Sequence, residues 1–368
     1  MGRESTPNTQ LWLQRLHIDG PLLAGVLVIA AFGLVVLYSA TGQSERQTLS
    51  QGIRLCVALV AMLVVAQVPP NFMRRYSGAA YALGLMLLLV VLIAGVTGKG
   101  AQRWIDIGFR FQPSEIMKIA VPMACAAYLH NRPLPPQFMP LVVLLLMIAT
   151  PAALIARQPD LGTAILIGAS GVIVILLAGL KFRVIFTGLA LIGAGLPLLW
   201  QNMHEYQRQR VITLIDPQSD PLGAGYNIIQ SKIAIGSGGL FGKGWTNGSQ
   251  GQLEYLPERS TDFIFAVIGE EFGLLGLVSL LLAYLFVIGR GLFIASQATD
   301  TFSRLLAGSI SLTFFMYVLV NTAMVTGLLP VVGVPLPLIS YGGTSMVTLM
   351  GAFGILMAIH TNRRLLPR

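Results

Sequence analysis

The sequence predicts an all-α integral membrane protein, a polytopic bundle of ten transmembrane helices. Hydrophobic residues make up 55% of its 368 residues, charged residues make up 11%, and the mean hydropathy is +0.74. A soluble chain of this length needs a larger share of polar residues to cover its surface. The apolar residues also gather in blocks of roughly 20, the length that an α-helix needs to cross the hydrocarbon core.

Ten candidate spans follow one another when hydropathy is averaged over a window of about 19 residues. They cover residues 22–40, 53–68, 77–97, 113–130, 137–156, 161–180, 182–199, 262–288, 305–328 and 341–360. The second span is short and begins at Arg54, whose long side chain can reach the polar interface. Only Gly179, Lys181 and Arg183 mark the boundary between the sixth and seventh spans.

Two segments between these spans have a distinct character, within what we treat as a single membrane domain, residues 1–368. Residues 200–261 form a long polar loop between the seventh and eighth helices. Residues 329–343 carry no charge and contain too many prolines for a helix. Irregular backbone at membrane depth is tolerated only where protein covers it or where it lines a wet cavity. We therefore expect a re-entrant outer loop that forms one wall of a cleft.

The distribution of Lys and Arg predicts the orientation in the membrane. With the N-terminus inside, the inner segments hold Arg3, Arg15, Arg74, Arg75, Arg132, Lys181, Arg183, Arg290, Arg304, Arg363, Arg364 and Arg368. The short outer loops hold only Arg46, Arg54, Lys99, Arg103, Arg110 and Arg157. Both termini are then cytoplasmic and the long loop is extracytoplasmic. The polar N-terminal tail has no small-residue cleavage site after its first apolar run, so we expect that run to be an anchor.

The net charge of +9 does not indicate a nucleic-acid partner. The basic residues are scattered through short loops, without the basic stripe and interleaved aromatic residues of a strand-binding groove. The two cysteines, Cys56 and Cys125, lie in apolar segments and do not suggest a disulfide framework.

Glu115 and Lys118 form the first polar constellation that we expect on the outer side. They are three residues apart just after Pro113, so they share one face in the first turns of a helix. Either the two charges only neutralise each other, or Lys118 faces a cavity and binds an anion while Glu115 fixes its position. Arg103 and Arg110, just before this helix, are further candidate cations for the same anion.

Three more outer residues are candidates with simpler explanations. Asp160 opens the span 161–180, and helix capping alone would explain it. Lys243 lies in a glycine-rich stretch that fails as a Walker A motif, because Gly244 follows it instead of Ser or Thr. These glycines either make turns or form an anion-binding nest beside Lys243. Arg210 ends a polar run in the long loop.

Asp262 is the leading candidate for chemistry, because it lies where the long polar loop enters an apolar helix. A carboxylate there can meet both a polar head group and a lipid tail, although an acid in the first turn of a helix is also favoured by the macrodipole alone. Small residues share its predicted helix face: Ala266, Gly269, Gly273 and Gly276. This stripe either admits a neighbouring helix or forms a groove for a lipid chain. Glu270 and Glu271, expected to lie deeper and off that face, have no assigned role.

The motifs along the chain resemble those of the SEDS family (shape, elongation, division, sporulation), in particular its elongation-associated branch. They are AQRW at 101–104, FQPSE at 111–115, QPDLGT at 158–163, QRQR at 207–210, QSKIAIG at 230–236, PERSTDF at 257–263 and GVPLP at 333–337. The resemblance extends from about Leu22 to His360. It implies a ten-helix bacterial inner-membrane peptidoglycan glycosyltransferase that polymerises lipid II outside the cytoplasm with a class B penicillin-binding protein. The essential acid of the family maps to Asp262, and its conserved polar pair maps to Glu115 and Lys118.

A reaction can be outlined on these residues. Asp262 is expected to act as the general base, because partial desolvation makes a carboxylate more basic, and attack opposite the leaving diphosphate would invert the anomeric centre. Lys118, Arg210 and Lys243 are the candidate cations for the diphosphate. The family suggests a divalent cation, Mg²⁺ or Mn²⁺, but no ligand cluster in the sequence identifies its site. The alternatives are a flippase for lipid-linked precursors and a noncatalytic scaffold of the elongation machinery.

Overall fold

The computed structural model describes residues 17–98, 101–106, 110–203, 205–220, 223–253 and 255–362. Its ten long helices are α2 (Gly20–Ala40), α3 (Glu45–Ala66), α4 (Pro70–Ala94), α5 (Ser114–Leu129), α6 (Phe138–Ala156), α7 (Leu161–Leu177), α8 (Phe182–Asn202), α12 (Ile264–Ser296), α13 (Thr301–Val325) and α14 (Thr344–Thr361). Each of the ten predicted spans coincides with one of these helices. The predicted class, a polytopic helical membrane protein, is therefore confirmed.

Hydropathy placed some helix boundaries wrongly. Helix α3 begins at Glu45, two turns before the predicted start, and α12 continues to Ser296 instead of ending at residue 288. The added turns are polar or mixed, and a hydropathy window does not count polar turns that extend beyond the hydrocarbon. Among the described helices, seven are long and apolar enough to cross a membrane on their own. The 16-residue helix α5, which carries Glu115 and Lys118, is not one of them.

Side chains that cap helix N-termini explain where several helices begin. The carboxylate of Asp19 accepts a hydrogen bond from the N–H of Leu22 at the start of α2, and Asp300 accepts one from Ser303 at the start of α13. The Ser44 hydroxyl caps α3 in the same way. Such caps satisfy backbone donors that the first helical turn leaves without partners.

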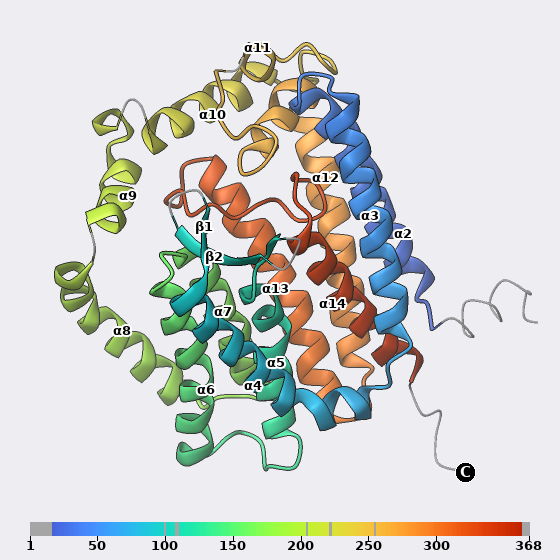
Figure 1. Ribbon diagram of the computed structural model, residues 1–368, viewed down its shortest axis with the longest axis vertical. Helices are drawn as coiled ribbons and strands as arrows, with labels where there is room; N and C mark the ends of the chain where they lie inside the picture. The colour runs from blue at the N-terminus through green and yellow to red at the C-terminus, as the bar shows by residue number, and fades with distance from the viewer. Residues whose placement is uncertain are drawn as a thin grey trace, which may run out of the picture.

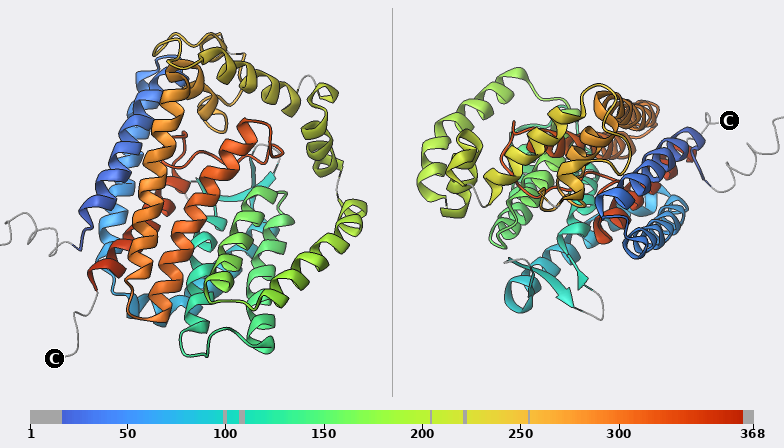
Figure 2. Two further views of the ribbon diagram at one scale, coloured as in Figure 1. Left: turned by 180° about the vertical axis from the view of Figure 1, so that it is seen from behind. Right: turned by 90° about the horizontal axis from the view of Figure 1, so that it is seen from above.

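Helix α13 is the centre of the bundle. It packs against α5 and α7 on one side and against α12 and α14 on the other, while α2 and α3 cover α12 and α14 (Figure 1). Helix α4 packs against α5, and α6 packs against α7. Helices α8 and α9 (Glu205–Ile215) are set apart from the other helices in both Figure 1 and Figure 2.

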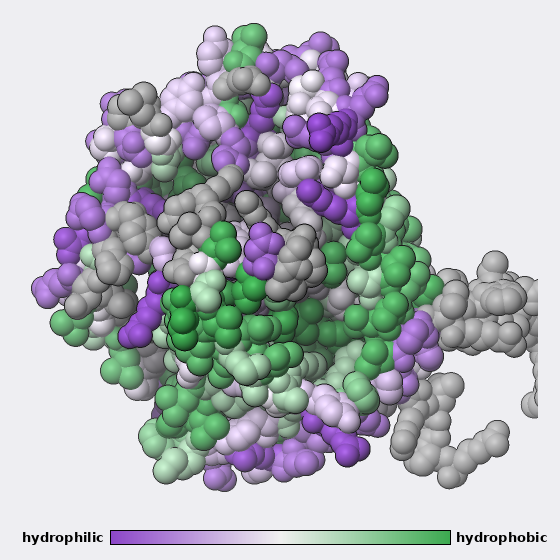
Figure 3. Space-filling model, viewed as in Figure 1, coloured by the Kyte–Doolittle hydropathy of each residue, from purple (hydrophilic) through white to green (hydrophobic). Residues whose placement is uncertain are grey.

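The surface divides as a bilayer requires. Apolar residues form a belt around the middle of the face in Figure 3, with polar residues above and below it. On one side of the belt, α2 begins and α14 ends, and Asp19 accepts a hydrogen bond from Arg290 at 2.6 Å and lies 3.2 Å from His360. We call this the terminal side, and the opposite side, which carries α10 (Ala224–Gly238) and α11 (Ser249–Gln252), the loop side.

The predicted long loop is largely helical. Residues 205–252 contain α9, the 3₁₀ helix η1 (Pro217–Ser219), α10 and α11. Helix α10 buries Ile228 and Ala234, and it packs against α12 and α13. A small antiparallel sheet is a further addition to the predicted all-α fold. Its strands are β1 (Val96–Gly98), β2 (Ala101–Asp106) and β3 (Arg110–Phe111), in the order β1-β2-β3.

Helix α12 is broken at Gly273, which has a φ of 64°. A Cβ atom on Gly269 would lie 3.3 Å from Leu277, although residues eight apart in a straight helix are separated by roughly 12 Å. The segment 264–272 therefore folds back against the long segment 274–296. The loop before it supplies the missing hydrogen bonds, since the N–H groups of Leu274 and Leu275 donate to Gly239 and Leu240.

Parts of the orientation prediction fall on residues that the structure does not describe. The N-terminal tail 1–16 and residues 363–368, with five of the twelve inner basic residues, lie outside the described residues, and so does Lys99. The backbone of Arg110 lies in β3, but its side chain is also outside the described part of the chain.

Candidate active site

Asp262 lies in the turn that immediately precedes α12, which begins at Ile264. Its carboxylate lies against the irregular segment predicted at 329–343: a Cβ atom on Gly333 would be 3.5 Å from Oδ2 of Asp262. Gly333 has a φ of 75°, a backbone conformation that glycine adopts without strain. The close approach of the carboxylate to this backbone thus depends on a residue without a side chain.

Hydrogen bonds join the irregular segment to the turn that holds Asp262. The N–H of Tyr341 donates to the carbonyl of Ser260 at 2.8 Å, and the hydroxyl of Ser340 donates to the carbonyl of Thr261. Helix α12 also holds the segment, because the hydroxyl of Tyr284 donates to the carbonyl of Pro337 at 2.6 Å. Val334, Leu336, Leu338 and Ile339 are all buried. The segment is thus irregular and covered by protein, and its re-entrant position at the outer face stays a prediction.

The same segment also lines a cavity that contains Lys118. Pro335, Leu336 and Ser340 form part of its wall, together with residues of α5, α13 and α14. Nζ of Lys118 is 2.7 Å from Oε1 of Glu115 and 5.4 Å from the ring centre of Tyr317. Both predicted properties of Lys118 are thus present: it is paired with Glu115 and it lines a cavity. The segment that lies against Asp262 therefore also lines the cavity of Lys118.

Asp160 and Arg103 form a second ion pair. Asp160 caps α7, since Oδ1 accepts a hydrogen bond from the N–H of Thr163 at 3.3 Å, as the capping hypothesis predicts. Its Oδ2 also lies 3.5 Å from Arg103 and accepts a hydrogen bond from Gln112 at 3.1 Å. Arg103 donates further to the carbonyl of Pro159 at 2.8 Å. These contacts attach the small sheet to the start of α7, a structural role for both residues.

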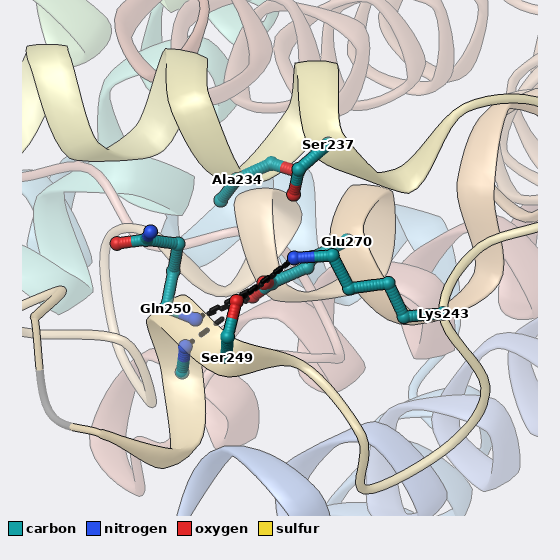
Figure 4. Close-up of polar contacts among 7 residues, drawn as sticks. Ala234, Ser237, Lys243, Ser249, Gln250 and Glu270 are labelled. Carbon is teal, nitrogen blue, oxygen red and sulfur yellow. Dashed lines mark hydrogen bonds and ion pairs between the residues drawn. The ribbon is translucent and has the colours of Figure 1, made fainter.

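Lys243 and Glu270 form a third ion pair, at 2.7 Å. Figure 4 shows Lys243, Ser249 and Gln250 around the carboxylate of Glu270, which is fully buried. Ser249 donates through its hydroxyl at 3.0 Å, Gln250 through its backbone N–H at 3.0 Å, and Gly251 through its N–H at 3.3 Å. The glycine-rich stretch therefore makes turns that surround a protein carboxylate. Lys243 serves this pair and is a weaker candidate for the substrate than expected.

Glu271 lies next to the C-terminal end of α2, on the loop side, and not deeper in the bundle as expected. Its carboxylate accepts a hydrogen bond from the hydroxyl of Ser39, one residue before α2 ends. The break at Gly273 accounts for the difference, because segment 264–272 no longer continues the long helix. Glu270 and Glu271 both attach this segment to surrounding loops.

Of the two explanations for the small residues on the face of Asp262, the groove for a lipid chain is wrong. Side chains and backbone fill the space beside each glycine of the stripe: a Cβ on Gly269 would lie 3.0 Å from Ile235 of α10, and one on Gly273 would lie 2.4 Å from the backbone of Gly242. A Cβ on Gly276 would lie 2.3 Å from Phe272. The small residues allow the chain to fold back and α10 to pack closely, which is the simpler of the two explanations.

Arg210 lies on α9, which packs against η1 and α10. Helix α9 is set apart from the other helices in Figure 1, and Arg210 does not line the cavity of Lys118. Asn321 and Glu270, by contrast, are polar contacts of this region that we did not predict. Each is a polar residue inside an apolar span, and such residues are functional candidates by default. That rule would have selected both.

Comparisons with known proteins agree with this architecture. A model of the FtsW/RodA/SpoVE family, described as cell cycle proteins, matches residues 20–365. The peptidoglycan glycosyltransferase MrdB of Escherichia coli (strain K12) is 49% identical over 364 residues, 98% of each chain. The probable peptidoglycan glycosyltransferase FtsW of Trichlorobacter lovleyi is 37% identical over 370 residues, 95% of this chain and 94% of the relative.

Solved structures are similar over nearly the whole chain. A chain from a peptidoglycan synthase complex that coordinates polymerization and crosslinking is 31% identical, with a TM-score of 0.83 over 94% of this chain and 98% of that one. The rod shape determining protein RodA of Thermus thermophilus is 26% identical, with a TM-score of 0.72 over 94% and 97% of the two chains. The chain therefore belongs to the FtsW/RodA/SpoVE family of cell cycle proteins, the SEDS family that its motifs resemble.

Proposed function

We propose that this protein is a peptidoglycan glycosyltransferase that polymerises lipid II on the outer face of the cytoplasmic membrane during cell elongation. The observation that carries the proposal is one irregular segment, 329–343, with the carboxylate of Asp262 against Gly333 and the cavity of Lys118 lined by Pro335 and Ser340. The proposed base, Asp262, thus lies against the same segment that lines the cavity of the proposed cation, Lys118. The names of the similar proteins, peptidoglycan glycosyltransferases, support the same reaction class.

In the proposed reaction a sugar hydroxyl of the acceptor attacks the anomeric carbon of the donor. The new glycosidic C–O bond forms while the bond from that carbon to the diphosphate oxygen breaks, and the diphosphate leaves with the electron pair. Asp262 takes the hydroxyl proton, the role of a general base. Attack from the face opposite the leaving group inverts the anomeric centre. Lys118 stabilises the negative charge that builds on the diphosphate.

A divalent cation fits this chemistry as part of the proposal. No group of three His, Cys, Asp or Glu side chains gathers anywhere in the described residues. Mg²⁺ commonly binds through one or two carboxylates together with substrate phosphates, and does not need a closed protein site. The substrate diphosphate would supply ligands of such an ion, and the ion would neutralise charge on the leaving diphosphate.

The proposed setting is the bacterial inner membrane, with both termini cytoplasmic and the loop side extracytoplasmic. In the described residues, α2 begins and α14 ends on the same side of the bundle, the terminal side, as this topology requires. The proposed partner is a class B penicillin-binding protein, by analogy with the synthase complex that couples polymerization to crosslinking. Lipid II, the nascent glycan strand and membrane lipid complete the set of interacting molecules.

Purified protein, fluorescent lipid II and the partner in vesicles test the proposal. Polymer formation by the wild-type protein, lost in Asp262→Asn at equal membrane abundance, is the expected result, because the amide keeps the size of the side chain but cannot accept the proton. Translocation without polymer would indicate a flippase, and neither activity would indicate a scaffold. Near-normal polymer from a well-expressed Asp262→Asn protein would overturn the assignment of the base.

A further inference from the structure

Asn321 contacts Asp262 from the central helix of the bundle. It lies on α13, one turn before the helix ends, and its side chain is fully buried. Nδ2 donates one hydrogen bond to the backbone carbonyl of Asp262 at 2.9 Å and another to the carbonyl of Val334 at 2.7 Å. One amide group therefore joins three elements: α13, the turn before α12 and the irregular segment 329–343.

These two bonds act on the backbone at the places where the Asp262 side chain is positioned. The first fixes the main chain of Asp262 itself. The second fixes Val334, the neighbour of Gly333, and Gly333 is the residue against which the Asp262 carboxylate lies. The –NH₂ group of Asn has two hydrogens and can satisfy both carbonyls at once, whereas a hydroxyl has only one.

The oxygen of the same amide indicates why Asn occupies this position. Oδ1 of Asn321 is buried and has no hydrogen-bond partner among the described residues. A buried polar atom without a partner destabilises a fold. An apolar side chain of similar size would avoid this cost but would remove both donated hydrogen bonds. The two donated bonds are therefore the contribution of Asn321 at this position.

We propose that Asn321 is a positioning residue for Asp262: it holds the backbone of the base at a fixed distance from the segment that lines the cavity. The inference rests on the proposed function, in which Asp262 accepts the proton of the attacking hydroxyl. Asn321 acts through Asp262 and contacts no reacting atom itself. The cavity residue Lys118 lies on α5, and its ammonium group donates to Glu115, so binding of the donor is not expected to depend on Asn321.

The test compares Asn321→Leu with Ser309→Ala in the lipid II polymerisation assay. Leu has nearly the shape of Asn but no donor. Ser309 is a matched control: it lies on the same helix, is fully buried, and donates to the carbonyl of Ser170 on α7 at 2.8 Å, away from Asp262. For Asn321→Leu we expect kcat to fall about 100-fold, the effect of a misplacement of roughly 1 Å in a catalytic group. KM for lipid II should stay near the wild-type value, and Ser309→Ala should keep both constants.

Hydrogen exchange supplies a readout that does not depend on activity. In Asn321→Leu, backbone amides in 258–264 and 331–341 should exchange faster, with the other helices unchanged. Asn321→Ser, which keeps one donor, should lose less kcat and provides the measurement if the Leu variant does not fold. A general rise in exchange in both variants would assign Asn321 to overall folding and overturn the inference. A rise in KM as large as the fall in kcat would overturn it as well. Wild-type kcat in the Leu variant would also overturn it.

The same preparation separates this inference from the proposed function. If Asp262→Asn polymerises normally, the assignment of the base fails, whatever Asn321→Leu does. If Asp262→Asn is inactive and Asn321→Leu is fully active, only the positioning role fails.

Discussion

The Glu115–Lys118 pair offers the sharpest test of the site, because its stabilising and functional roles predict different results. Nζ of Lys118 lies 2.7 Å from Glu115, and the two side chains are only 15% and 6% exposed. Lys118→Met leaves a buried carboxylate without its counter-ion, which typically destabilises a protein by about 3–5 kcal/mol. The double variant Glu115→Gln, Lys118→Met removes both charges, and its free energy of unfolding should return close to that of the wild type.

Activity should not return with stability. If Lys118 stabilises the leaving diphosphate, the double variant lacks the cation and should polymerise no better than Lys118→Met. The Lys243–Glu270 pair is the matched control, with the same 2.7 Å separation and a fully buried carboxylate outside the cavity. Its double variant, Lys243→Met with Glu270→Gln, removes an ion pair outside the cavity, so any loss of polymer yield should follow the loss of stability.

The assay is polymer yield at equal membrane abundance, alongside thermal unfolding in detergent. A Glu115→Gln, Lys118→Met protein that is clearly more active than Lys118→Met would refute the reasoning. The pair would then have a structural role only, and the cation for the diphosphate would have to be sought elsewhere.

Three further predictions address topology, the broken helix and acid stability. A cysteine at the exposed position Gln218 should react with an impermeant reagent added outside the cell, and one at Arg75 should not; the reverse pattern would invert the proposed topology. Gly273→Ala should sharply reduce the folded yield, since Gly273 has a φ of 64° and a Cβ there would lie 2.4 Å from the backbone nitrogen of Gly242. The control Gly289→Ala, in the same helix, places its Cβ in open space and should be tolerated. Burial raises the pKa of Asp19, but hydrogen bonds from Arg290 and Leu22 and the charges of His360 and Arg290 outweigh it and hold the pKa below its ordinary value of 3.8. The stability from Asp19 is thus present above pH 3.8 and lost as the pH falls through the lower folded pKa, and unfolding of Asp19→Asn measured between neutral and acidic pH should lack this dependence.

Hydropathy and local spacing predicted what depends on neighbouring residues. The ten helices follow from the hydropathy of contiguous residues. The Glu115–Lys118 contact and the cap at Asp160 follow from interactions within one helical turn. The irregular segment 329–343 also followed from its prolines and lack of charge. These features need no knowledge of which helices are neighbours in space.

Contacts between distant segments could not be predicted in this way. Arg103 pairs with Asp160, and Lys243 pairs with Glu270, across 57 and 27 residues of sequence. Nothing in the local sequence marks Gly273 as the residue where the helix breaks, since the break depends on hydrogen bonds with the separate segment 239–244. The groove prediction failed for this reason, because a helical-wheel argument assumes a straight helix.

The different surroundings of the two Lys–Glu pairs determine which lysine can exchange its partner for a substrate. A lone charge is expensive in a low-dielectric site, so a buried lysine needs a carboxylate while no substrate is bound. Both oxygens of Glu270 accept hydrogen bonds, from Lys243, Ser249 and backbone N–H groups, which makes a closed set. The carboxylate of Glu115 accepts a hydrogen bond from Lys118 through Oε1, but its Oε2 is buried without a hydrogen-bond partner among the described residues. Lys118 is therefore held by one oxygen and lines a cavity, the arrangement in which a diphosphate with two or more negative charges can compete for the ammonium group.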